Sequence, residues 1–92
     1  MQDWPRGNNY LVDQLKRALC SALLNLVEGN HRRTCKERGR FFEISRASLS
    51  EVAAIVDMAE ILGFMNLEAH ARYKSELLQL TKMIAKLKSF WS

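Results

Sequence analysis

The feature that most constrains this 92-residue chain is a helical spacing of apolar residues that is broken at only two short segments. Apolar residues recur at three- and four-residue intervals over residues 11–28, 35–62 and 67–90, as they do in amphipathic helices. The breaks, 29–33 and 63–66, each contain a glycine, and the chain has one proline in all. Such sparse punctuation favours long helices over many short strands. Short connections usually join antiparallel neighbours, so the pattern predicts an all-α, up-down-up helical bundle.

The ends of the predicted helices have residues that are typical of helix caps. Thr34 and Glu37 form a capping box for the second helix, in which each side chain bonds the backbone amide of the other. Gly29 stands where a left-handed residue closes the first helix. Asn8 or Asn9 can cap the start of the first helix, and Asn66 the start of the third. Gly63 ends the second helix.

Each predicted helix has a face for burial. The predicted seam of the second helix consists of Phe42, Ser45, Leu49, Val52, Val56 and Ala59. That of the third helix consists of Tyr73, Leu77, Leu80, Ile84, Leu87 and Trp91. The first helix has so broad an apolar face, Cys20 included, that more than one neighbour is needed to cover it. Cys35 instead lies at an exposed helix start. We therefore expect a single domain over residues 1–92, with 1–9 as an N-terminal extension, completed by oligomerisation.

A stripe of polar residues follows one side of the first helix: Gln14, Arg17, Ser21, Asn25 and Glu28. Either the stripe is simply solvated or it contacts the second helix. With the loop centred near residue 31 or 32, Arg17 lies level with residues 47–49, and Gln14 lies level with Glu51. We predict an Arg17–Glu51 ion pair, with Gln14 and Ser48 nearby, that fixes the register of the two helices.

The strongest local charge feature is a run of five cations opposed only by Glu37: Arg32, Arg33, Lys36, Arg38 and Arg40. The net charge of this run equals the formal +4 of the whole chain. Clustered cations form an electrostatic footprint for phosphates, although a solvated turn has the same composition. Glu28 opposes the dipole of its own helix, so we expect its partner to be Arg32 or Arg33.

Patterns for catalysis and metal binding are absent from the sequence. His31 and His70 belong to no HExxH pattern or Cys/His cluster, and there is no glycine-rich phosphate loop. We therefore expect no enzyme, catalytic residue, metal, cofactor or small-molecule substrate. The chain does not start like a secretory signal, and its most apolar run, 18–27, is shorter than the about 20 residues of a membrane span. Two cysteines without a CxxC pair indicate thiols in a reducing cytoplasm.

Three parts of the chain resemble the patterns of a known family. QLKRA at 14–18 with NLVEG at 25–29 is similar to QLxRA…NIAEG, and RFFEISRASLSE at 40–51 is similar to RFFxIAxGSxxE. ILGF at 61–64 resembles the turn before the last helix of the family. On these motifs the chain is identified as a member of the four-helix-bundle proteins encoded in 23S rRNA intervening sequences. The resemblance covers residues 8–90.

The resemblance implies an antiparallel bundle and a ring-like homo-oligomer, notably a pentamer. It also implies nucleic-acid binding, the usual proposal for a family that is similar to the RNA-associated accessory protein of diversity-generating retroelements. Two departures are visible: Ala47-Ser48 replaces Gly-Ser, and the helix that family members have before the position of Trp4-Pro5 has no counterpart. We expect a shortened version, a truncation, or a member that fills the gap by oligomerising differently.

Two hypotheses of function remain open. The first is a cytoplasmic homo-oligomeric bundle that binds structured RNA or DNA without sequence specificity through the five cations of residues 32–40, with RNA the more expected of the two ligands. The second is a protein-binding adaptor or scaffold that uses an exposed apolar helix face, with the basic turn only solubilising the chain. The two differ in salt dependence, because phosphate binding weakens steeply with salt and apolar docking does not.

Overall fold

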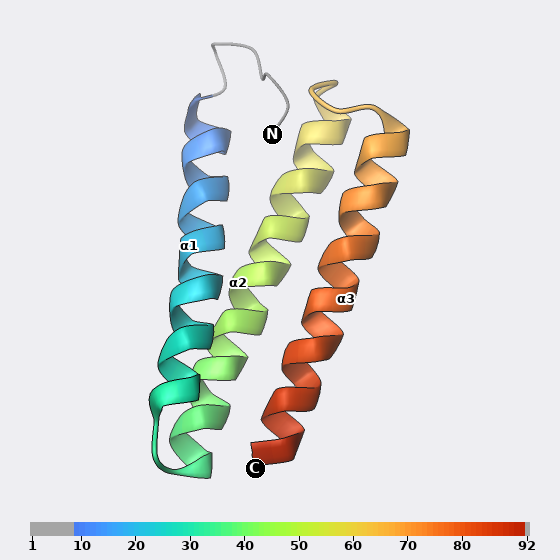
Figure 1. Cartoon of the computed structure of the whole chain (residues 1–92). Helices are drawn as coiled ribbons and strands as arrows, with labels where there is room; N and C mark the ends of the chain where they lie inside the picture. The colour runs from blue at the N-terminus through green and yellow to red at the C-terminus, as the bar shows by residue number, and fades with distance from the viewer. Residues whose placement is uncertain (1–8, 92) are drawn as a thin grey trace.

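The computed structural model describes residues 9–91, and side chains over residues 10–90, as three long helices and two turns (Figure 1). The helices are α1 (Asn9–His31), α2 (Cys35–Ile61) and α3 (Leu67–Trp91). In Figure 1, α1 runs down the page, α2 returns beside it and α3 runs down again. Within the described residues there is no strand, which confirms the all-α class. Residues 1–8, which include most of the predicted N-terminal extension and the predicted cap Asn8, lie outside the described part, as do the side chains of Asn9, the first residue of α1, and of Trp91.

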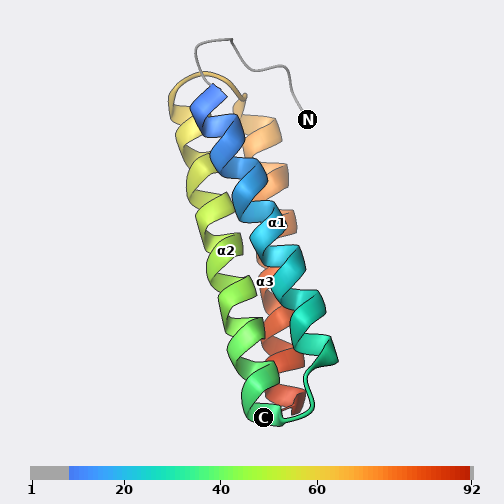
Figure 2. The same ribbon diagram turned by 90° about the vertical axis from the view of Figure 1, so that its left-hand side faces the viewer.

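The three helices form a V in cross-section, with α2 at its vertex. Figure 1 shows α2 between α1 and α3, and Figure 2 shows α2 displaced to one side of both. Among the described residues, α1 and α3 each pack along α2 but make no close backbone contact with each other. Side chains join the three helices, because each of two core clusters takes residues from all of them. The fold thus leaves one long side of α1 and of α3 without a helical neighbour.

The seam predicted for α2 is buried in full. Phe42 and Ser45 have no solvent exposure, and the remaining seam residues, Leu49, Val52, Val56 and Ala59, are also buried. The seam of α3 is confirmed in part: Ile84 is buried, and Tyr73, Leu77 and Leu87 pack against the core. Leu80 is the exception at 45% exposure. Because α1 does not pack directly on α3, the side of α3 next to the opening of the V stays in solvent.

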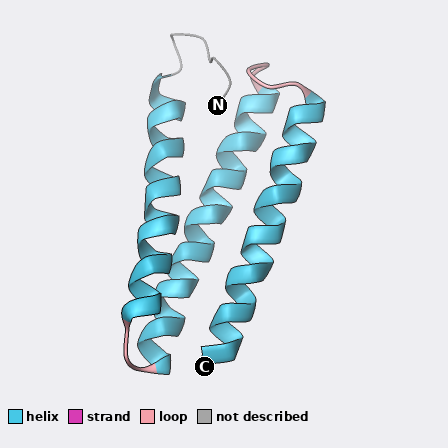
Figure 3. Cartoon of the chain, viewed as in Figure 1, coloured by secondary structure: helices cyan, strands magenta, loops and turns pink. Residues whose placement is uncertain are grey.

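The first turn differs from the prediction. We expected Gly29 to end the first helix in a left-handed conformation, but α1 continues to His31, and Gly63 is the glycine of the described residues with positive φ. Gly29 is instead buried inside the helix against Phe42. Its role is therefore to let α1 approach α2 closely, and the turn that follows covers only residues 32–34, as Figure 3 shows.

The other predicted helix ends are found where the sequence places them. The hydroxyl of Thr34 accepts a bond from the Glu37 amide (3.1 Å), but the reciprocal bond of the capping box does not form between described residues. Asn66 Oδ1 accepts from the Ala69 amide (2.7 Å) and so caps α3. Gly63, with φ of 82°, closes α2 in a Schellman motif: its amide bonds the Glu60 carbonyl, and the Phe64 amide bonds the Ala59 carbonyl.

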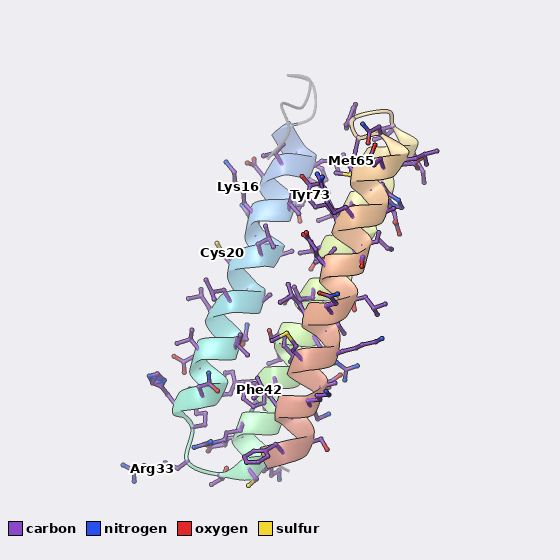
Figure 4. The ribbon with its side chains drawn as sticks, turned by 45° about the vertical axis from the view of Figure 1, so that its right-hand side comes forward. Lys16, Cys20, Arg33, Phe42, Met65 and Tyr73 are labelled. Atoms are coloured by element: carbon purple, nitrogen blue, oxygen red, sulfur yellow. The ribbon has the colours of Figure 1, made fainter. Side chains whose placement is uncertain are left out.

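The surface of α1 departs from the prediction at Cys20. We expected this thiol in the core, but it is exposed and points away from α2, as Figure 4 shows. Cys20 lies opposite the buried side of α1 on the helical wheel, so the broad apolar face extends beyond what α2 and α3 cover. Cys35 is exposed, as predicted. None of the described helices is long and apolar enough to cross a membrane.

Candidate nucleic-acid interface

The turn between α1 and α2 is built by two of the five predicted cations. Arg38 Nε donates to the carbonyl oxygen of Arg32 (2.7 Å), which ties the first turns of α2 back to the end of α1. The Arg32 guanidinium donates to Glu28 (2.8 Å) and lies 4.6 Å from the ring centroid of Phe41. The predicted cationic partner of Glu28 is therefore confirmed as Arg32. A guanidinium over an aromatic face adds a favourable cation–π contact.

The other three cations of the run project into solvent at the same end of the bundle. Arg33, Lys36 and Arg40 are all exposed, and Figure 4 shows Arg33 extending away from the helices. Lys36 and Arg40 are four residues apart on α2, which places them one above the other on a single face. The five cations thus divide into two that fix the turn and three that are presented by it.

The polar stripe of α1 makes a relay of hydrogen bonds to α2, but not the predicted ion pair. Asn25 Nδ2 donates to Ser21 (2.7 Å to the carbonyl and 3.3 Å to Oγ), and the Ser21 and Ser48 hydroxyls are 2.8 Å apart. Ser48 donates its hydrogen to the Ile44 carbonyl (3.1 Å). A hydroxyl has one hydrogen, so Ser21 is the donor to Ser48. The stripe therefore contacts α2 through its small polar residues.

The predicted Arg17–Glu51 ion pair is wrong. Both side chains are exposed, and the ion pairs between described residues do not join them. Ser21, and not Arg17, lies opposite Ser48, so the register is shifted by about one helical turn from the prediction. In this observed register Arg17 lies at about the level of Glu51, but both side chains stay in solvent and do not pair. Gln14 is half-buried and bonds no described side chain of α2.

Three interactions that the sequence did not reveal hold the helices together. Ser45 Oγ donates to the Ala22 carbonyl (2.7 Å) in the core between α1 and α2. Lys88 of α3 donates to Glu43 of α2 (2.9 Å), and Arg46 reaches the same carboxylate oxygen (3.2 Å). The bond from Lys88 holds the pKa of Glu43 below its ordinary value of 4.5.

The third interaction is at the other end of α3. Asp57 of α2 accepts from His70 (2.7 Å) and from Lys74 (3.0 Å), both of α3. The only signal in the sequence for such pairs is an acid and a cation in different helices, and many combinations satisfy it. The pairs become evident only once the register of α2 on α3 is known.

Groups of side chains that could hold a metal ion are not found among the described residues. The two histidines have local roles: the His31 ring nitrogen Nδ1 is 3.3 Å from the Val27 carbonyl oxygen of its own helix, and His70 pairs with Asp57. Both histidines therefore have a hydrogen-bond partner within the bundle.

This geometry defines a class: small helical-bundle proteins that present a cationic turn at one end. Residues 1–86 match the sequence model of a family described as the 23S rRNA-intervening sequence protein. The chain belongs to this family, as its motifs indicated. No curated protein matches the chain in sequence.

Proposed function

We propose that this protein binds structured nucleic acid, RNA in preference to DNA, through the exposed cations at the α1–α2 end of the bundle, and that it catalyses no reaction. The observation that carries the proposal is the presentation of Arg33, Lys36 and Arg40 in solvent by a turn that Arg32 and Arg38 hold in shape. A cation without a carboxylate partner has its full charge and all of its hydrogen-bond donors available for phosphate. The preference for RNA rests on the family resemblance, because the cations themselves suit the phosphates of either nucleic acid.

The division of the five cations sharpens the proposed site. Arg32 shares its charge with Glu28, so its contribution to phosphate binding is smaller than that of its exposed neighbours. Arg38 acts through its bond to the turn backbone. We therefore assign direct contacts to Arg33, Lys36 and Arg40, and positioning roles to the other two. A turn of fixed shape lowers the ordering cost of binding.

The protein is further proposed to be a cytoplasmic homo-oligomer whose subunits meet through α1. Residues 18–27 of α1 contain no charged side chain, yet Leu23 and Leu24 are 61% and 63% exposed, and Leu19, Cys20 and Val27 are exposed beside them. A helix that is apolar nearly all round is normally covered. A second copy fits this surface because two uncharged stretches of one sequence are self-complementary in a symmetric contact. The pentamer that the family resemblance implies would instead pair this surface with a different surface of the next copy, because a five-fold ring is built from head-to-tail contacts.

The nucleic-acid proposal is tested by binding a labelled RNA hairpin and a matched DNA duplex at about 50 and 200 mM salt. The test variant is Arg33→Ala/Lys36→Ala/Arg40→Ala. Three phosphate contacts predict a loss of about 40-fold in affinity over this salt range for the native chain. The triple variant should bind far more weakly and show a nearly flat salt response.

A charge-matched control separates the site from the general charge of the protein. Lys16, Arg17 and Arg72 are exposed and lie toward the opposite end of the bundle, so Lys16→Ala/Arg17→Ala/Arg72→Ala removes the same charge. Its affinity should stay within a few-fold of the native value. Equal losses in the two triple variants, or no native binding at low salt, would overturn the proposal.

A second candidate function, a protein-binding adaptor or scaffold, is favoured by the same exposed stretch of α1. Leu23→Gln/Leu24→Gln distinguishes the possibilities, because both side chains are exposed and their loss leaves the core intact. If copies of the chain cover this surface, sedimentation will show oligomers for the native chain and smaller species for the variant. A native monomer without nucleic-acid affinity would instead favour the adaptor.

A further inference from the structure

A shallow groove of about 560 Å³ lies between the first turns of α2 and the last turns of α3. Lys36, Arg40 and Lys88 line it, the first two from α2 and the third from α3. Glu43 is the one acid among its lining residues. The groove therefore joins two of the exposed cations of the turn to a lysine that is far away in the sequence.

All three cations contribute side-chain surface, most of it from their apolar stems, to the walls of this groove. Lys36 and Arg40 are one helical turn apart, on one face of α2. The stem of Lys88 crosses over Gly39, where a β-carbon would lie 3.9 Å from its Cγ and Cε atoms. The stem of Lys88 thus lies along α2 beside Gly39, and its ammonium reaches Glu43.

Glu43 occupies only part of the binding capacity of Lys88. An ammonium group has three donors, and the Lys88 ammonium bonds Glu43 Oε2 at 2.9 Å. The Lys88 side chain remains 39% exposed, so an anion in the groove has access to its other hydrogens. Glu43 also bonds Arg46 through the same oxygen. The carboxylate thus holds Lys88 in place and, at the same time, repels an incoming anion.

We propose that this groove binds a backbone phosphate of the nucleic acid, held by Lys36, Arg40 and Lys88, and that Glu43 limits the affinity. The inference rests on the proposed function and extends the interface from the turn to α3. Its consequence is that Lys88, which lies far from the basic run in the sequence, contributes to binding together with the cations of the turn, and does so fully once Glu43 is neutralised.

The first experiment isolates Lys88 from its partner by working in a Glu43→Gln background. Glu43→Gln alone should tighten binding of the RNA hairpin several-fold at about 50 mM salt, because it removes the opposing charge. Adding Lys88→Gln should then weaken binding about tenfold and lower the salt slope by about one. Lys86→Gln is the matched control: it removes an exposed lysine of the same helix end that does not line the groove. It should change affinity less than about twofold.

The second experiment locates the ligand with the two natural thiols. Cys35 lines the groove, whereas Cys20 lies on the outer side of α1 (Figure 4), and both are exposed. The assay uses the Leu23→Gln/Leu24→Gln variant, which keeps Cys20 outside a contact between copies. Alkylation by uncharged iodoacetamide, followed by mass spectrometry, should slow at Cys35 when the RNA hairpin is bound and remain unchanged at Cys20. The same assay with inorganic tripolyphosphate reports on the groove without nucleic acid.

The outcomes separate this inference from the proposed function. RNA binding that is equally sensitive to Lys88→Gln and Lys86→Gln, or that leaves Cys35 unprotected, overturns the groove and leaves the exposed turn as the interface. If RNA does not bind, the proposed function fails. The alkylation assay with tripolyphosphate then shows whether the groove binds phosphate at all. Protection of Cys35 alone then supports a phosphate site, and no protection overturns it.

Discussion

Gly29 of α1 lies so close to the ring of Phe42 of α2 that a β-carbon on Gly29 would be 2.6 Å from Cε1 and 2.8 Å from Cδ1. Phe42 has no solvent exposure and packs in the core cluster that it forms with Ala22, Leu49 and Ile84, so its ring has no free space to enter. Figure 4 shows Phe42 between the helices at this level. The contact sets how closely the ends of α1 and α2 approach each other.

Gly29→Ala should therefore destabilise the fold even though alanine is the better helix former. Overpacking a well-filled core costs about 1–3 kcal/mol, and the gain in helix propensity offsets about 1 kcal/mol of it. We expect a net loss of up to about 2 kcal/mol in the free energy of unfolding, measured by urea denaturation followed by circular dichroism. A variant as stable as the native chain would show that Phe42 moves aside more easily than its burial indicates.

Gly39→Ala should have the opposite effect, which makes it the matched counterpart. Gly39 is helical, and its added β-carbon would meet the flexible stem of Lys88 at 3.9 Å, an ordinary van der Waals distance. Alanine then restricts the unfolded chain without strain in the folded one, a gain of about 0.4–1 kcal/mol. The same urea denaturation measures it. A loss of stability here would mean that the stem of Lys88 cannot shift.

Ser45→Ala tests the hydrogen bond that fixes the register of α1 on α2. Ser45 Oγ donates to the Ala22 carbonyl at full burial, so its loss should cost about 0.5–1.5 kcal/mol. Ser50 is exposed on the same helix, and Ser50→Ala serves as the control with an effect below about 0.5 kcal/mol. If the two variants are equally stable in urea, the register is held by packing alone.

The sequence predicts the helices of this protein well, because their determinants are local. Thr34, Gly63 and Asn66 act through backbone groups within a few residues, and the seam of α2 follows from the helical period alone. Seven-residue spacing forces Phe42, Leu49 and Val56 onto one side, whatever the partner is. The class of fold is therefore contained in the pattern of apolar residues and in the caps.

The register and the division of the cations could not be predicted, because they depend on distant contacts. Gly29 has the same local sequence signal whether it ends a helix or lies against a ring, and only the position of Phe42 decides. The pattern of charges does not show that Arg17 and Glu51, which lie at about the same level of α1 and α2, both stay in solvent without pairing. Nor does the composition of the basic run tell which arginines bond the turn.

The pairing of Asp57 with α3 predicts how stability changes in acid. His70 and Lys74 bond its two oxygens, and the bond from His70, followed by that from Lys74, holds the pKa of Asp57 below 3.8. Unfolded aspartate has a pKa of about 3.9, so as pH falls the unfolded chain takes up the proton first. The stabilisation is thus present above about pH 4 and is lost as pH falls through the folded pKa. Urea denaturation between about pH 5 and 3 should show a shallower decline in stability for Asp57→Asn than for the native chain. The control is Asp13→Asn, which alters an exposed acid outside the described ion pairs and should keep the native decline. Equal slopes in all three proteins would assign the acid sensitivity to other carboxylates.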